Sequence, residues 1–123
     1  MATIKSFTSL EQSRKLAEIL PIESADYHYI AQGEKSYLYP YSLSSDAIKN
    51  YDEEIKYIPC WSLSALLGVL PDDCCGIDKE DGKYAASYVV SNEGGTYISD
   101  NPVDACVAMV EKLNELKLLR LWK

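Results

Sequence analysis

His28 is the residue of this sequence best suited to acid–base chemistry, because it is the only histidine in the chain. A catalytic base needs a nucleophile or an orienting carboxylate at a recognisable spacing, and no serine or cysteine stands in such a motif. His28 instead lies between Tyr27 and Tyr29, a position typical of a half-buried strand residue. The sequence therefore indicates no catalytic residue and favours a protein that is not an enzyme.

Metal binding has little support in the spacing of the cysteines and acids. The acids between residues 72 and 81 lack the residue order of a calcium-binding loop. The cysteines lack the paired C-x2-C spacing that places two thiolates on one zinc ion. We therefore expect no metal, no cofactor, a solvated acidic loop and idle or buried thiols. The four cysteines are Cys60, Cys74, Cys75 and Cys106.

Tyrosines alternate with other residues between positions 27 and 41, which predicts two short strands joined through residues 32–35. A tyrosine ring joins a large contact area to a hydrogen-bonding hydroxyl, so a row of them suits a surface for a partner or ligand. The alternative is that the rings simply cover the sheet beneath helices. The candidate surface consists of Tyr27, His28, Tyr29, Tyr37, Tyr39, Tyr41 and, from the apolar C-terminal segment, Trp122.

Capping signals predict a helix near each end of the chain. Thr8 and Glu11 have the spacing of a capping box, which predicts a helix over about residues 9–20. Asn101 and the proline after it predict the start of a helix over about 102–117, because proline is tolerated at the first helical position. Apolar residues recur at helical spacing in both segments, so one side of each helix should be buried.

A third helix is predicted over about residues 60–70, between prolines at positions 59 and 71 that fix its ends. Its leucines recur at i, i+3, i+4 and i+7, and we expect all of them to be buried as one stripe. The large ring of Trp61 should close one end of the core. These leucines are Leu63, Leu66, Leu67 and Leu70.

The order of helix, hairpin, helix, strands and helix predicts an α+β fold. Asp81 and Gly82 form a strong tight-turn signal, and a second turn near residues 92–95 completes a meander of strands. We expect a single domain over residues 1–123, with an antiparallel sheet of four to five short strands. The three helices should pack mainly on one face of that sheet.

The composition is that of an ordinary soluble globular protein, with 123 residues, 47% hydrophobic and 25% charged. A formal net charge of −7 argues against nucleic-acid binding, because phosphate backbones attract clustered lysine and arginine. No apolar run reaches the roughly 18 residues that span a bilayer, and the N-terminus lacks a secretory signal. We therefore expect a cytoplasmic protein that binds neither nucleic acid nor membrane.

Three segments resemble small uncharacterised proteins encoded by gut bacteria and their prophages or mobile elements. They coincide with the three predicted helices and together cover a little under half of the chain. The resemblance implies a bacterial cytosolic protein of unassigned function, and it supplies no catalytic residue. The segments are SFTSLEQSRKLAEILPIESAD, IPCWSLSALLGVLP and DNPVDACVAMVEKLNELKLL.

Three hypotheses for the function follow. The first is an interaction module without catalysis, an accessory or regulatory protein that contacts a protein partner or a second copy through the tyrosines or residues 118–122. The second is a ligand-binding protein or enzyme with a pocket between sheet and helices, using His28, a tyrosine hydroxyl and an acid. The third is an acidic mimic of nucleic acid, in which residues 46–81 inhibit a basic host protein.

Overall fold

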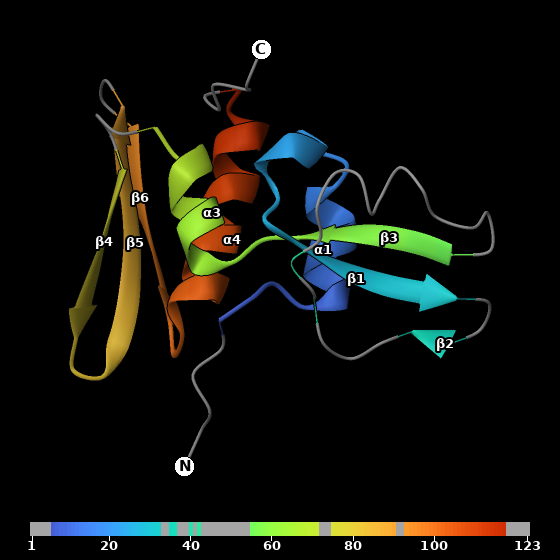
Figure 1. Ribbon diagram of the computed structural model, residues 1–123. Coiled ribbons are helices and arrows are strands. Elements are labelled where there is room, and N and C mark those ends of the chain that lie inside the picture. The colour runs from blue at the N-terminus through green and yellow to red at the C-terminus, as the bar shows by residue number, and fades with distance from the viewer. Residues whose placement is uncertain are drawn as a thin grey trace.

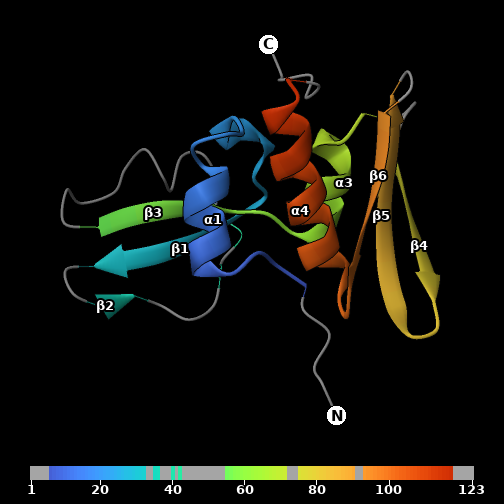
Figure 2. The same ribbon diagram turned by 180° about the vertical axis from the view of Figure 1, so that it is seen from behind.

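The strands form two antiparallel sheets with a layer of helices between them (Figures 1 and 2). Each sheet has three strands in the part of the chain that the computed structural model describes, which is residues 6–32, 35–36, 40, 42, 55–71, 75–90 and 93–117. The prediction of a single α+β domain with short antiparallel strands is confirmed. The expectation of one sheet with the helices mainly on one face is wrong, because the strands form two separate sheets and helices pack against each of them.

The first sheet is built on the strand that the tyrosine spacing predicted. β1 (Tyr27–Gln32) pairs on one side with the two-residue β2 (Lys35–Ser36) and on the other with β3 (Ile55–Cys60). Both pairings are antiparallel, so β1 is the central strand. The predicted hairpin therefore forms the middle and one edge of this sheet.

The second sheet is an antiparallel meander, as the turn signals predicted. β4 (Cys75–Glu80), β5 (Lys83–Val90) and β6 (Glu93–Ser99) lie side by side in that order. Asp81 and Gly82 connect the first two strands with positive φ angles of 53° and 78°. These angles are those that a tight hairpin turn requires, and Gly82 adopts its angle without a steric penalty.

The N-terminal helix, α1 (Leu10–Leu16), begins with a capping box one residue later than predicted. The Ser9 hydroxyl accepts a hydrogen bond from the Gln12 backbone N–H at 3.1 Å, and the Gln12 side chain accepts one from the Ser9 N–H at 2.9 Å. The assignment of the box to Thr8 and Glu11 is therefore wrong. Thr8 is fully buried and uses its hydroxyl inside the core, so that hydroxyl is not available to the helix end.

The central helix, α3 (Leu63–Val69), is capped by the Ser62 hydroxyl, which accepts from the Ala65 N–H at 3.2 Å. It contacts a short 3-10 helix, η1 (Ile22–Ser24), which is distant from it in the sequence. The expectation that all four leucines are buried is wrong for Leu67, which is 40% exposed, and Leu63 is only partly buried, while Leu66 and Leu70 are buried. A seven-residue helix buries a narrow side against its neighbour, and Leu67 lies beyond that side, next to β4.

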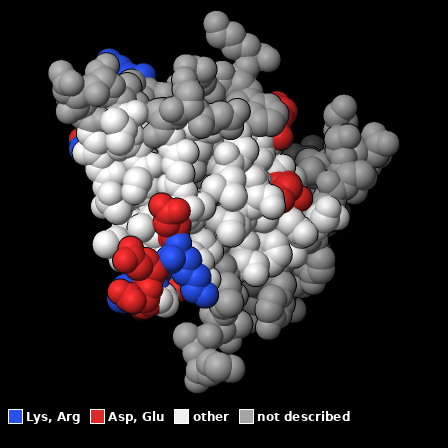
Figure 3. Space-filling model, turned by 90° about the vertical axis from the view of Figure 1, so that its left-hand side faces the viewer, with Lys and Arg blue, Asp and Glu red and all other residues white. Residues whose placement is uncertain are grey.

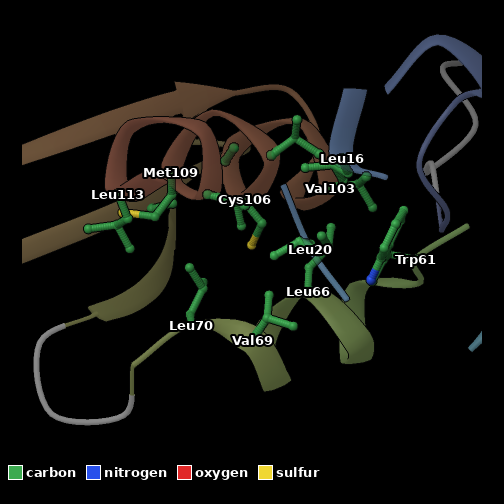
Figure 4. Close-up of a cluster of buried hydrophobic side chains, with 14 of the residues drawn as sticks. Leu16, Leu20, Trp61, Leu66, Val69, Leu70, Val103, Cys106, Met109 and Leu113 are labelled. Carbon is green, nitrogen blue, oxygen red and sulfur yellow. The ribbon is translucent and has the colours of Figure 1, made fainter. Parts of the chain in front are cut away.

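The C-terminal helix, α4 (Pro102–Glu115), lies near the centre of the protein and contacts both α3 and the second sheet. Asn101 caps it as predicted, accepting a hydrogen bond from the Asp104 N–H at 2.8 Å. Figure 4 shows its apolar side facing the leucines and valine of α3, with Trp61 closing one end of the cluster. The fully buried residues of this helix include Val103, Cys106, Met109, Val110 and Leu113.

A buried hydrogen-bond network ties the N-terminal segment to the residues before α3. The Thr8 hydroxyl is 2.7 Å from the Ser13 hydroxyl and accepts from the Trp61 backbone N–H at 3.1 Å. The Thr8 N–H donates to the Trp61 carbonyl at 2.9 Å, and the Trp61 indole N–H donates to the Ser24 hydroxyl at 2.9 Å. The network joins α1, η1 and the end of β3 into one unit.

Candidate functional site

The aromatic strand β1 places two of the predicted tyrosines on its inner side. Tyr29 is only 7% exposed, and its hydroxyl donates to the Thr8 carbonyl at 2.8 Å. Burial raises the pKa of Tyr29 to about 12, and the neighbouring Cys60 adds to this effect. Tyr27 is half-buried and meets the Phe7 ring edge-on, with 4.7 Å between ring centroids. These two rings stabilise the contact between β1 and the N-terminal segment rather than forming an open surface.

His28 points to the opposite side of β1 from the two tyrosines, because neighbouring residues of a strand alternate between faces. Its side chain is buried, with 7% exposed, and its Nδ1 atom has no hydrogen-bond partner among the described residues. Burial lowers the pKa of His28, and the negative charge of Asp26 offsets part of that shift. The structure therefore does not join His28 and these tyrosines in one site.

The burial of His28 predicts a specific pH dependence of stability. Folding lowers the pKa below its ordinary value of 6.5, so the unfolded chain takes up a proton at a higher pH than the folded chain does. The free energy of unfolding should be highest above this value and should fall as the pH drops from 6.5 toward the lower folded pKa. Urea unfolding of the wild type and of His28→Gln at a series of pH values measures the effect.

His28 is the chain's only histidine, so His28→Gln should remove most of the pH dependence in this range. Carboxylates titrate at lower pH and affect both proteins alike. Equal slopes of stability against pH in the two proteins would show that His28 does not exchange a proton on folding.

The other predicted contact residues, Tyr37, Tyr39, Tyr41 and Trp122, lie outside the described residues. The same holds for residues 118–122 and for all the acids between residues 46 and 73 that motivated the mimicry hypothesis. Asp78, Glu80 and Asp81 are described and exposed at the end of the β4–β5 hairpin.

A shallow hollow of about 420 Å³ lies beside β1, with Asp26 and Tyr27 in its wall. The Asp26 carboxylate accepts hydrogen bonds from both the backbone N–H and the hydroxyl of Ser62, at 2.9 Å and 2.5 Å. Since the Ser62 hydroxyl also caps α3, this pair fixes the start of the helix. His28 does not line the hollow, and the carboxylate in its wall, Asp26, is bonded to the Ser62 hydroxyl that caps α3.

The described cysteines and acids do not assemble a metal site. Within the described ranges, no group of three or more His, Cys, Asp or Glu side chains is placed to hold a metal ion. Cys60 and Cys106 are fully buried, as expected. Burial raises the pKa of both thiols, that of Cys106 to about 11, so they remain protonated and poorly nucleophilic at neutral pH.

The sequence reasoning missed the open outer face of the second sheet. The register places alternate residues of β4, β5 and β6 on the side away from α4, where Val89 is 67% exposed and Ile98 is 66% exposed. Figure 3 views the molecule from this side and shows a broad uncharged area, with a cluster of charged side chains at its lower end and a few others at its borders. We define the outer sheet face by Gly76, Ala85, Ser87, Val89, Gly94, Thr96 and Ile98.

Charged residues on this side of the sheet gather at the hairpin end, on β4 and at the start of β5. Asp78 and Glu80 are exposed on β4, and Lys83 forms an ion pair with Asp100 at 2.8 Å. Ser87 and Thr96 form a cross-strand pair in the middle of the face, with their hydroxyls 3.1 Å apart. The outer sheet face therefore offers small polar and aliphatic groups on a rigid, hydrogen-bonded support.

Comparison with known proteins supplies no relative for this chain: no family model, no curated protein and no solved structure matches it. Among the helices of the described residues, none combines the length and apolar character needed to cross a membrane.

Proposed function

We propose that this protein is a protein–protein interaction module without catalytic activity, and that it binds through the outer sheet face. The observation that carries the proposal is the exposure of two aliphatic side chains, Val89 and Ile98, on a side of the sheet whose charged residues gather at the β4–β5 hairpin, in a protein of net charge −7. Val89 and Ile98 lie toward the two ends of this face, with the uncharged pair Ser87 and Thr96 between them. The centres of protein interfaces are depleted of charge, as the middle of this face is.

The support beneath this face favours binding with little rearrangement. The other side of β5 is anchored in the core by Ala86 and Tyr88, which are both buried. Each strand of the sheet is hydrogen-bonded to its neighbour, so the outer side chains have a fixed backbone. A surface that is already ordered loses little conformational entropy on binding, which increases the affinity obtained from a given contact area.

The two other hypotheses have less support. A ligand pocket that uses His28 with a tyrosine and an acid requires these groups to converge, but His28 is separate from the hollow at Asp26 and Tyr27. Nucleic-acid mimicry depends on the acidic region from 46 to 81, most of whose acids lie outside the described residues. The interaction proposal rests on described side chains alone.

A photo-crosslinking experiment in cells that produce the protein tests the proposal. Benzoylphenylalanine at position 89 places the reactive group on the outer sheet face, and the same residue at position 14, on the exposed side of α1, is the matched control. We expect adducts with another protein from position 89 that are absent from position 14. Adding Ile98→Lys should remove them, because it places a charge within the same contact surface.

Identical adducts from both positions, or no adduct from position 89, would contradict the proposal.

A further inference from the structure

We infer that a second copy of this chain pairs with β6, antiparallel and edge to edge, about a two-fold axis at Thr96. This inference deepens the proposed function and rests on it for the use of the second sheet as an interface. The pairing would join two three-stranded sheets into one continuous sheet of twice the width, with the outer sheet faces of both copies on the same side.

The first argument comes from the outer edges of the two sheets. Proteins usually protect an edge strand by making it short or by placing proline or charged side chains along it. The described part of the first sheet follows this rule, because β2 has two residues and β3 contains Lys56 and Pro59. On the second sheet, β4 carries the consecutive charged residues 78–80, but β6 has neither charge nor proline from residue 94 to 99. β6 is therefore the one edge in the described structure without such protection.

The strand is also accessible. Within the described structure β6 pairs only with β5, and α4 packs against its inner side. Gly94, Thr96 and Ile98 on its outer side are all exposed. A strand of seven residues offers its unpaired backbone N–H and C=O groups along roughly 24 Å, at about 3.4 Å per residue.

The sequence of β6 is complementary to itself in one register. A two-fold axis in an antiparallel pair passes through the midpoint between residues that face each other, and Thr96 is the middle residue of the strand. Centring the axis there pairs all seven residues and places each large side chain opposite a glycine, with Gly95 opposite Tyr97 and Gly94 opposite Ile98. Moving the centre to a neighbouring residue shortens the pairing and removes this match.

The inner side of β6 supplies an aromatic contact for this register. The Tyr88 ring lies over Gly95 so closely that a side chain there would place its Cβ 2.8 Å from the ring. In the pair, Tyr97 of the second copy stands opposite Gly95, so its ring would lie beside that of Tyr88. Aromatic rings on neighbouring strands attract each other. A glycine on an edge strand has no side chain, so the ring of a tyrosine on the paired strand can lie next to it.

The helix layer is compatible with the pairing. α4 packs alike against β5 and β6, so its axis lies over the space between them. Strands are about 4.8 Å apart, which places α4 of the second copy roughly two strand spacings away, at about 10 Å. Packed helices have axes about 8–10 Å apart, so this spacing leaves room for the two copies of α4 to lie side by side.

Charge reversal at Thr96 tests the inference by sedimentation equilibrium of the full-length protein at micromolar concentration. The wild type should be a dimer of twice the 13.8 kDa chain mass. Thr96→Lys and Thr96→Asp should each weaken self-association roughly tenfold or more, because the axis places like charges opposite each other. An equimolar mixture of the two variants should restore the dimer, since Lys then faces Asp.

Ser87→Lys is the matched control, because Ser87 is the hydrogen-bonded neighbour of Thr96 on the same face, one strand further from the axis. Its two copies would be about three strand spacings apart, roughly 14 Å, which exceeds the screening length of about 8 Å at physiological salt. This variant loses the same Ser87–Thr96 contact but should remain a dimer. Far-ultraviolet circular dichroism shows whether each variant is folded.

A monomeric wild type, an unaffected Thr96→Lys variant or a mixture that stays monomeric would each overturn the inference. If the Thr96 variants do not fold, amide hydrogen exchange of the wild type tests the pairing instead. Dilution of the protein separates the two copies, so it should selectively reduce the protection of the β6 amides. Protection that does not change on dilution would overturn the inference. The proposed function fails separately: a monomer that still forms adducts from position 89 refutes only the pairing. A dimer paired at β6 that forms no adducts with another protein from position 89 refutes only the binding of another protein.

Discussion

Replacing Trp61 by alanine should lower the free energy of unfolding by about 3–5 kcal/mol, a large part of the roughly 5–15 kcal/mol that stabilises a typical domain. The Trp61 side chain is fully buried and closes one end of the apolar cluster (Figure 4). Its removal leaves a cavity that the surrounding helices cannot fill. It also removes the indole N–H that donates to the Ser24 hydroxyl. Urea denaturation followed by circular dichroism measures the change.

Two variants separate the causes of this loss. Trp61→Phe keeps an aromatic ring but not the hydrogen bond to Ser24, so it should lose less stability than Trp61→Ala. Leu67→Ala removes a partly exposed leucine of α3 and should cost about 1 kcal/mol or less. If Trp61→Ala cost no more than Leu67→Ala, the burial of Trp61 would not be what holds this end of the core together.

Replacing Thr8 by valine should be the second most damaging change, although the two side chains have nearly the same shape. The Thr8 hydroxyl serves both the Ser13 hydroxyl and the Trp61 backbone N–H in a fully buried position. Valine would leave both groups without that partner, at about 1–3 kcal/mol for each. Thermal and urea unfolding should show a loss well beyond the effect of an ordinary surface substitution.

Thr8→Ser is the control for this prediction, because it keeps the hydroxyl and removes only a methyl group, which costs about 1 kcal/mol. The valine variant should therefore be clearly less stable than the serine variant. The reverse order would mean that packing of the methyl group, and not the hydrogen bonds, is the main contribution of Thr8.

Local signals in the sequence predicted most elements of the fold. Asn101 with the following proline marked the start of α4, and the Asp81-Gly82 pair marked the β4–β5 turn. These signals act within a few residues, and the structure confirms both. The capping box at α1 shows the limit of such reasoning: Thr8 and Ser9 can both cap a helix, and the choice depends on Trp61, which is distant in sequence.

The division of the strands into two sheets could not be predicted, because alternation reveals a strand but not its neighbour. The exposure of Leu67 has a similar cause. Helical spacing placed it on the same stripe as Leu66, while the width of the buried side depends on how α4 packs against α3. Both outcomes are set by contacts between segments far apart in the chain.

The candidate surface was predicted less well than the fold. The spacing correctly placed Tyr27 and Tyr29 on one side of a strand, but it could not show that this side faces the N-terminal segment. The outer sheet face was missed because β5 is uncharged on both sides after Lys83, so its sequence does not distinguish the core side from the open side. The contrast between the charged residues of β4 and the uncharged residues 94–99 of β6 was the available signal.

The central position of α4 has a consequence for biosynthesis. This helix is translated after every other described element, yet it supplies eight buried residues to the layer between the two sheets. Until it leaves the ribosomal exit tunnel, α3 and the inner side of the second sheet lack their main apolar cover. In the nascent chain, the earlier segments therefore remain without a complete apolar core. Cooperative folding of this domain has to follow the synthesis of α4.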